Sequence, residues 1–140
     1  MSGSGLVQNG LRQFEPNPQA RALMVICAYN EGIKLERTLR RFRPPDQRDY
    51  DVLVVDDGST DGSIEKINPQ DFRVHRMGYC AGVGAAIRAA IKLARELNYD
   101  IIMFMAGNDK DRPDEISRIL DPVRHNGLAL IQGSRYLPGG

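Results

Sequence analysis

The chain has 140 residues, the length of a single domain with one hydrophobic core. Hydrophobic residues make up 41% and charged residues 26%, which is typical of a soluble globular domain and excludes a fibre, a coiled coil or a disordered chain. The 19 Lys and Arg residues against 18 Asp and Glu residues leave a net charge of +1, so the sequence lacks the excess of positive charge that non-specific nucleic-acid binding requires.

The sequence contains no segment typical of a secretory signal, a membrane span or a metal cluster. The longest apolar stretches, 23–28 and 101–107, are far below the roughly 18 residues that span a bilayer. Cys27 and Cys80 are too far apart for a metal-ligand spacing, and they favour a reducing, cytoplasmic environment. Residues 1–20 lack a basic region followed by an apolar run, so we interpret them as a polar N-terminal extension.

From residue 21 onward, short apolar runs alternate with segments of helical periodicity. In chain order they predict a strand at 22–28, a helix over 31–42 that ends before Pro44-Pro45, strands at 51–55 and 73–75, a helix over 84–97, a strand at 101–105, a helix over 113–123 and a strand at 128–131. This alternation predicts an α/β fold of three layers, in which a mostly parallel sheet is flanked by helices.

Polar, acidic and glycine-rich segments follow the predicted strands. They are YNEG at 29–32, DDGSTDG at 56–62, AGNDKD at 106–111 and GSRY at 133–136. In open α/β sheets, ligands bind beyond the carboxyl ends of the strands, and parallel strands bring these ends to one edge. The sequence therefore predicts that these segments share one ligand site.

The segments VICAYNEG, DVLVVDDGSTDGS, GVGAAIRAAI, PDEI and GSRYLPGG occur in this order and with approximately the spacing of family 2 glycosyltransferases. The chain resembles this family from about Leu23 to its last residue, and the dolichyl-phosphate mannose or glucose synthase-like branch is the most similar. The resemblance implies a GT-A, Rossmann-like fold, of which residues 21–140 would be the N-terminal, nucleotide-sugar-binding part. The acceptor motifs of the family lie further along than Gly140.

The resemblance also implies a reaction. A hexose from a UDP- or GDP-hexose would be transferred with inversion at the anomeric centre, and the acceptor would be a polyprenyl phosphate at a membrane surface. A phosphate monoester, with a second pKa near 6, is already largely ionised at neutral pH, so this acceptor needs no general base. The protein would then be cytoplasmic and peripheral to the membrane.

The nucleotide site implied by the resemblance follows the first two strands. Tyr29 would pack beside the base, Glu31 would lie near the ribose, and Asp57 would accept hydrogen bonds from the base or ribose, since a carboxylate suits hydroxyl and imino donors. The predicted set is completed by Ala28, Asp56 and Gly82. Considered without the family, the acidic pair at 56–57 before Gly58 is equally a turn signal.

The loop 106–111 carries the predicted cation site. The family has an Asp-x-Asp here that holds Mg²⁺ or Mn²⁺ against the diphosphate leaving group. Counting back from PDEI, the two aspartates fall on Ala106 and Asn108, whereas this chain has its Asp-x-Asp three residues later, at Asp109 and Asp111. Either Asp109 or Asp111 binds the cation in a shifted loop, or the Asn108 amide binds it weakly, or metal binding is lost. The predicted catalytic residues are Asp109, Asp111 and Arg135, whose guanidinium fork suits a phosphate.

Two other classes of function stay open from the sequence. A non-catalytic nucleotide-binding module, or an inactive fragment, is favoured by the displaced acidic loop and by the missing acceptor half. Another α/β nucleotide-binding enzyme could share the fold. Dinucleotide binding is disfavoured, because the glycine-rich turn at 82–86 does not continue as GxGxxG.

Overall fold

The fold is that of a computed structural model, which describes residues 6–8, 11–13 and 16–127. The chain divides into two compact units. One is Arg21–Asp114, and the other consists of the described residues of Met1–Ala20 and Glu115–Gly140.

The larger unit is built on a four-stranded sheet in which every pairing is parallel. The strands lie in the order β5 (Arg73–Arg76), β4 (Asp51–Asp56), β3 (Ala22–Ala28) and β6 (Ile101–Ala106). They agree with the strands predicted at 22–28, 51–55, 73–75 and 101–105. Ala28 pairs with Asp56 and Cys27 with Ala106, so the carboxyl ends of β3, β4 and β6 are level with one another.

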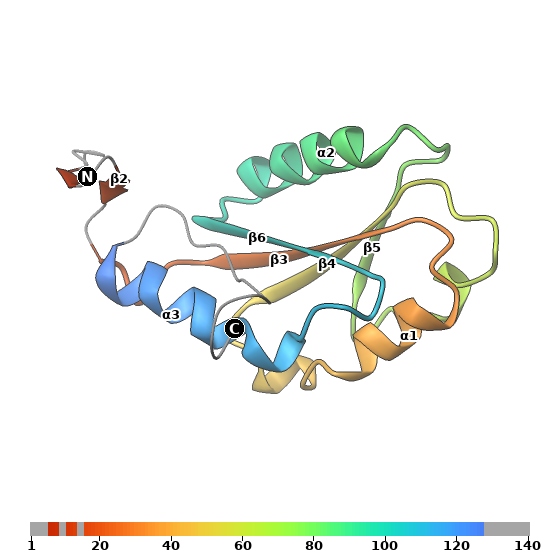
Figure 1. Cartoon of the computed structure of the whole chain (residues 1–140), viewed down its shortest axis with the longest axis horizontal. Helices are drawn as coiled ribbons and strands as arrows, with labels where there is room; N and C mark the ends of the chain where they lie inside the picture. The colour runs from red at the N-terminus through yellow and green to blue at the C-terminus, as the bar shows by residue number, and fades with distance from the viewer. Residues whose placement is uncertain (1–5, 9–10, 14–15, 128–140) are drawn as a thin grey trace. The chain divides into compact units, whose positions relative to one another are not determined.

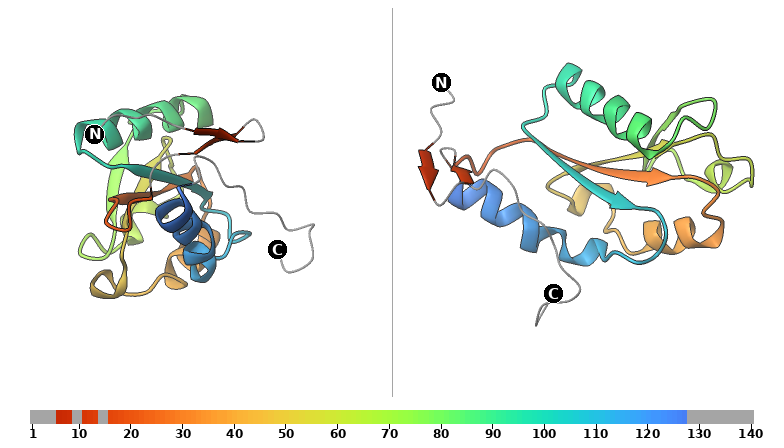
Figure 2. Two further views of the ribbon diagram at one scale, coloured as in Figure 1. Left: turned by 90° about the vertical axis from the view of Figure 1, so that its left-hand side faces the viewer. Right: turned by 45° about the horizontal axis from the view of Figure 1, so that its top comes forward.

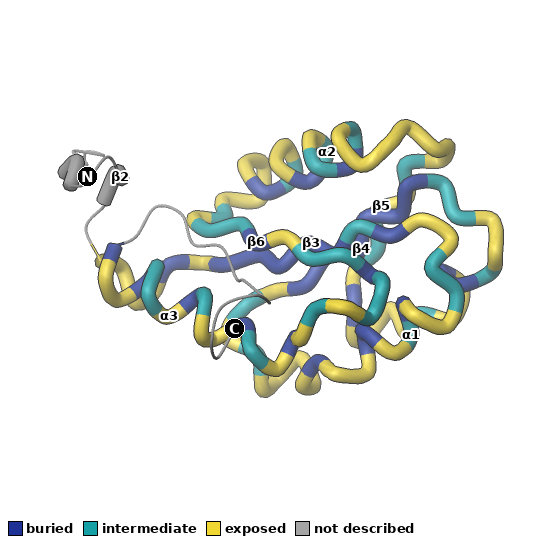
Figure 3. Tube along the Cα trace, viewed as in Figure 1, coloured by how far each residue is buried: buried dark blue, intermediate teal, exposed yellow. Residues whose placement is uncertain are grey.

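The apolar runs form strands because β3 and β4 are buried on both faces (Figure 3). Val25, Ile26, Val54 and Val55 have no exposed surface at all. A strand covered on both sides has a continuous apolar sequence in place of an alternating one. β6 is less covered, and its Phe104 is 43% exposed.

Helices cover both faces of this sheet, with α1 (Ile33–Arg40) on one side and α2 (Val83–Glu96) on the other (Figures 1 and 2). The predicted three-layer α/β fold is therefore confirmed. The first helix is shorter than the predicted 31–42, because Asn30 and Gly32 have positive φ values that a helix does not accept. Short 3₁₀ turns lie at Pro45–Gln47, Ile64–Lys66 and Pro113–Glu115.

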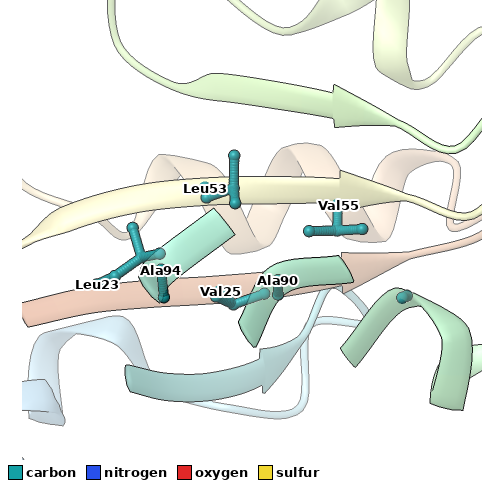
Figure 4. Packing of buried hydrophobic residues seen from close by; sticks show 7 residues of the cluster. Leu23, Val25, Leu53, Val55, Ala90 and Ala94 are labelled. Atoms are coloured by element: carbon teal, nitrogen blue, oxygen red, sulfur yellow. The ribbon is translucent and has the colours of Figure 1, made fainter. Parts of the chain in front are cut away.

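The core between α2 and the sheet is formed by small residues of the helix and branched residues of the strands (Figure 4). Ala86, Ala90 and Ala94 recur at the spacing of one helical face and are all buried. They pack with four buried residues of β3 and β4, namely Leu23, Val25, Leu53 and Val55. Because alanine adds a single methyl group, the helix can lie close to the sheet.

The smaller unit contains a hairpin and a helix. β1 (Leu6–Gln8) pairs with β2 (Leu11–Gln13) in antiparallel register, where we expected only a polar extension. Asn-Gly at positions 9–10 of the sequence is the pair typical of a tight hairpin turn, and it is the signal for this element. α3 (Ile116–Asn126) follows the 3₁₀ turn at Pro113.

Buried Arg124 ties α3 to the segment before the sheet, because its Nε and Nη2 atoms donate to the Ala20 carbonyl oxygen at 3.1 and 2.8 Å. The strand predicted at 128–131 lies outside the described residues. Among the helices that the structure describes, none is long and apolar enough to cross a bilayer.

The packing of α1 predicts a contrast between two of its apolar residues. Leu35 is 1% exposed and Ile33 is 53% exposed. Leu35→Ala should lower the free energy of unfolding by about 2–5 kcal/mol, because it opens a cavity that the sheet cannot fill. Ile33→Ala should change it by less than about 0.5 kcal/mol. Urea denaturation of both variants measures the difference, and equal losses would mean that α1 does not pack through Leu35.

Candidate functional site

The strand order places a topological switch point between β3 and β6. From β3 the chain passes through α1 to β4, and it reaches β6 through α2 on the opposite face of the sheet. Ligands of open α/β sheets bind at the carboxyl ends of strands whose connections diverge in this way. The loops 29–32 and 107–112 follow these two strands, and the loop 57–63 follows neighbouring β4.

Two of these loops are joined by reciprocal hydrogen bonds. The Asn30 backbone N–H donates to Ser59 Oγ at 3.0 Å, and the Thr60 N–H donates to Asn30 Oδ1 at 2.7 Å. The Gly32 N–H donates to Asp61 Oδ2 at 2.9 Å. These contacts, which we call the loop clamp, fix the segment that carries Tyr29 and Glu31. The clamp has no local signal in the sequence, because its partners lie 29 or 30 residues apart.

Asp61 is held at the other end of the clamp by Ser63. Its Oδ1 accepts from the Ser63 hydroxyl at 2.6 Å and from the Ser63 N–H at 3.0 Å. These hydrogen bonds, the hydroxyl first, hold the pKa of Asp61 below its ordinary value. Asp61 is therefore ionised, and it accepts hydrogen bonds from both loops.

Asp57 connects the end of β4 to the start of α2. Its side chain is buried, Oδ1 accepts from the Ala81 N–H at 2.8 Å, and Oδ2 accepts from the Gly82 N–H at 3.0 Å. Its own N–H donates to the Ala28 carbonyl oxygen at 2.9 Å. We call this set of contacts the Asp57 bracket, and it engages three residues of the predicted nucleotide site: Asp57, Ala28 and Gly82.

Asp56 is more deeply buried than Asp57, with 1% of its surface exposed. Its Oδ1 accepts from the Ser59 N–H at 2.8 Å, and its Oδ2 lies 3.5 Å from Nε of Arg76. Arg76 is itself paired with Glu65 at 2.7 Å. The carboxylate of Asp56 is therefore enclosed by protein groups. A direct contact between Asp56 and a nucleotide stays a prediction.

Tyr29 and Glu31 differ from these carboxylates because their side chains are free. Tyr29 is 47% exposed and Glu31 is half-buried. Within the described part of the chain, neither side chain has a hydrogen-bond or ion-pair partner. Of the residues predicted to bind a nucleotide, these two present groups that a ligand can use directly.

The acidic loop, residues 107–112, folds back onto α1. The Asp109 N–H donates to Thr38 Oγ1 at 2.9 Å, and Asp109 Oδ1 lies 2.9 Å from Nη2 of Arg41. Asp111 Oδ2 accepts from the Ala106 N–H at 3.4 Å. At the beginning of the loop a Cβ on Gly107 would lie 2.9 Å from Leu35 Cδ1, so the backbone is closely packed there.

As they are placed, the predicted metal ligands do not fit a divalent cation. Asn108 Oδ1 accepts from the Lys110 N–H at 3.2 Å, and Asp109 Oδ1 is committed to Arg41. Over the residues that the structure describes, no three His, Cys, Asp or Glu side chains gather in a way that could hold a metal. Arg135, the predicted phosphate contact, lies outside the described residues.

The two thiols lie close to the Asp57 bracket. Burial raises the pKa of the Cys27 thiol, and the Asp57 carboxylate adds to this rise. Cys80 is exposed, and its Sγ lies 3.7 Å from Asp57 Oδ2. Both cysteines are free, so neither takes part in a disulfide.

A groove of about 380 Å³ lies away from the strand ends, between α1 and the segment 63–72. Its lining includes apolar Leu39 and Phe72, with Arg43 and Lys66 beside them. None of the residues predicted for the site lines this groove. We therefore place the candidate site at the carboxyl ends of the strands, where the predicted carboxylate and aromatic side chains lie.

The approach of the turn 78–82 to β4 predicts different outcomes for two glycines with the same φ of +86°. A Cβ on Gly58 would lie 2.6 Å from the Cys80 nitrogen, whereas nothing lies within 4 Å of one on Gly78. Gly78→Ala should cost the left-handed strain alone, about 1–2 kcal/mol. Gly58→Ala should cost about 2 kcal/mol more, because backbone must move. Urea unfolding measures both, and equal losses would show that the turn yields freely.

The low pKa of Asp61 predicts an acid-sensitive clamp. Because the folded pKa is lower than the unfolded one, the stability from Asp61 is complete above the ordinary carboxyl pKa and is lost as the pH falls through the lowered value. Ser63→Ala should move the Asp61 pKa upward in an NMR titration. Asp61→Asn should flatten the acid limb of a plot of urea midpoint against pH. An Asp61 pKa that is unaffected by Ser63→Ala would rule out this cause.

Comparison with known proteins supplies a family. The sequence pattern of Glycosyl transferase family 2 matches residues 24–140. A polyprenol monophosphomannose synthase of Mycolicibacterium smegmatis is 34% identical over 129 residues, covering 88% of this chain and 48% of the relative. An undecaprenyl-phosphate mannosyltransferase of Micrococcus luteus is 35% identical over 125 residues, covering 86% and 50%. The chain thus spans about half the length of these curated relatives.

Solved structures agree on the fold. A mannosyltransferase from Pyrobaculum calidifontis, in complex with GDP-Man and Mn²⁺, superposes with a TM-score of 0.51 at 23% identity, covering 66% of this chain and 29% of that one. The larger unit thus has the sheet and flanking helices of the GT-A fold over part of its length. With a family pattern that matches from β3 to the last residue, the chain belongs to glycosyl transferase family 2.

Proposed function

We propose that this chain is the donor-binding part of a glycosyltransferase that transfers a hexose from a UDP- or GDP-hexose to a polyprenyl phosphate. Membership of the family supports sugar transfer. The names of two relatives, a polyprenol monophosphomannose synthase and an undecaprenyl-phosphate mannosyltransferase, support a mannosyl donor and a lipid phosphate acceptor. The observation that carries the proposal is the pair of free side chains, Tyr29 and Glu31, on a clamped loop at the switch point.

Tyr29 and Glu31 are assigned to the nucleoside. An exposed aromatic ring offers a flat apolar face to a base, and a carboxylate accepts hydrogen bonds from ribose hydroxyls. The loop clamp holds the backbone between these residues through Asn30. A loop that is already ordered loses little conformational entropy when it binds a ligand, which favours affinity.

Asp57 has a different part in this proposal. Both of its carboxylate oxygens accept backbone hydrogen bonds from the start of α2. Oδ1 accepts only from Ala81 among the described residues and can accept a second bond, so a contact with the base remains open to it. The main effect of Asp57 is to hold the turn 78–82 against the end of β4. A loss of nucleotide binding in Asp57→Ala would therefore follow either from a lost contact with the base or from a displaced turn.

The chemistry that we propose is a single displacement. An acceptor phosphate oxygen forms a bond to the anomeric carbon, and the bond from that carbon to the nucleoside diphosphate breaks, which inverts the centre. The acceptor phosphate is already ionised at neutral pH, so no general base is required of the chain. Dependence on Mg²⁺ or Mn²⁺ stays a prediction, and no step here is assigned to a metal.

A non-catalytic nucleotide-binding module is the second candidate. It is favoured by the acidic loop, in which the carboxylate of Asp109 pairs with Arg41 at the end of α1. Both candidates bind a nucleotide-sugar, but only the glycosyltransferase transfers the sugar to an acceptor. Measuring binding and transfer on the same chain therefore separates them.

Calorimetric titration of the chain with GDP-mannose, UDP-glucose and UDP-N-acetylglucosamine, with Mn²⁺ and with EDTA, tests the proposal. Tyr29→Ala should weaken binding of the preferred donor about tenfold, the usual effect of removing an aromatic ring that stacks on a base. Glu31→Gln should weaken it too, through the ribose contact.

Phe104→Ala is the matched control, because Phe104 is also an exposed aromatic residue and lies on β6, away from the strand ends. It should bind as the wild type does. Binding of no nucleotide would overturn the proposal for this chain. Binding without transfer to polyprenyl phosphate would favour the nucleotide-binding module.

A further inference from the structure

The end of α1 holds the acidic loop at two points. Thr38, which is fully buried, donates its hydroxyl proton to the Lys34 carbonyl and accepts from the Asp109 N–H. Arg41 lies three residues further along, so both residues are on one face of the helix end. Its Nη2 lies 2.9 Å from Asp109 Oδ1, and its Nη1 donates to the Asp111 carbonyl oxygen at 3.4 Å.

The ion pair between Arg41 and Asp109 is more enclosed than an ordinary surface pair. The Asp109 side chain is 20% exposed, and its Oδ1 atom is buried and accepts no hydrogen bond in the described chain, so the ion pair with Arg41 is its one polar contact there. The Asp109 backbone has a positive φ of 65°, a conformation that side-chain-bearing residues rarely adopt. By contrast, the neighbouring Arg40 pairs with Glu36 at side-chain exposures of 72% and 36%. Such an exposed pair within one helix has little effect on its surroundings.

We propose that Arg41 is the resident cation of the acidic loop, and that it competes with a divalent cation for the Asp109 carboxylate. Proteins commonly hold Mg²⁺ and Mn²⁺ through one or two carboxylates, and Oδ1 of Asp109 already faces a guanidinium group. A divalent cation on the same oxygen would lie within a few ångströms of this positive charge, where the repulsion is strong. Asp109 therefore becomes a metal ligand only when Arg41 moves away.

Control of cation binding at the donor site by Arg41 rests on the proposed function. The guanidinium group holds the acidic loop against α1 without metal, so Arg41 is a positioning residue. Its effect on metal binding is a property of the chain itself, and it is measurable with Mn²⁺ alone.

Mn²⁺ titrations followed by electron paramagnetic resonance, without nucleotide, test the competition. Arg41→Gln should bind Mn²⁺ about tenfold more tightly than the wild type, equivalent to about 1.4 kcal/mol. Arg41→Lys keeps the positive charge and should bind Mn²⁺ nearly as weakly as the wild type. Arg40→Gln removes a positive charge from the neighbouring residue, which belongs to the exposed pair with Glu36. This variant should leave the affinity for Mn²⁺ unchanged.

The Asp109→Asn background completes the experiment. If Arg41 acts through this carboxylate, Arg41→Gln should give no gain in Mn²⁺ affinity once Asp109 is changed, which is a non-additive cycle. The urea midpoint of each variant shows that it is folded, and Arg41→Lys provides the readout should Arg41→Gln unfold.

Two results would overturn the inference. One is that Arg41→Gln and the wild type bind Mn²⁺ equally, whether strongly or not at all. The other is a gain that persists with Asp109→Asn. Failure to bind nucleotide-sugars would count against the proposed function alone, since the Mn²⁺ titrations contain none.

Discussion

The hydrogen bonds between the Asp57 carboxylate and the backbone of Ala81 and Gly82 are the contact on which the site edge depends. The first helical turn of α2 follows Gly82, a residue with no side chain to cap a helix. Asp57, directly after β4, supplies the acceptor, and its negative charge lies beside the positive end of the helix dipole. Gly58 allows this approach because any side chain there would meet the backbone of Tyr79 and Cys80. The strand end and the helix start are in this way a single structural element.

The polar groups at the strand ends are mostly satisfied by one another. The clamp between Asn30, Ser59 and Thr60 and the anchoring of Asp61 by Ser63 use up donors and acceptors that would otherwise need water. These contacts join exposed residues of two loops, and together they restrain the segment 30–32 against the segment 59–63. Against this background, a free side chain is informative: it is held in place by its backbone and is open to a ligand.

Two carboxylates at this edge are paired with arginines, Asp56 with Arg76 and Asp109 with Arg41. Asp57 and Asp61 instead accept hydrogen bonds from uncharged backbone and hydroxyl groups. Family membership leads one to expect a metal in the acidic loop. In this chain, Arg41 at the end of α1 contributes a positive charge 2.9 Å from Asp109, the first carboxylate of the displaced Asp-x-Asp.

The sequence by itself determined the fold of the larger unit, its strands and helices to within a few residues, and the family. Strands and helices could be predicted because burial of one face imposes a periodic pattern of apolar residues, and that pattern is visible in the sequence. The tertiary structure alone decided which polar residues are free and which are used inside the protein. Asp57 and Tyr29 look equally suited to a nucleotide in sequence, but Asp57 meets a turn 24 residues away and Tyr29 meets no partner among the described residues. Hydrogen bonds between distant loops depend on how the strands are ordered in the sheet, and a local pattern of residues carries no information about that order.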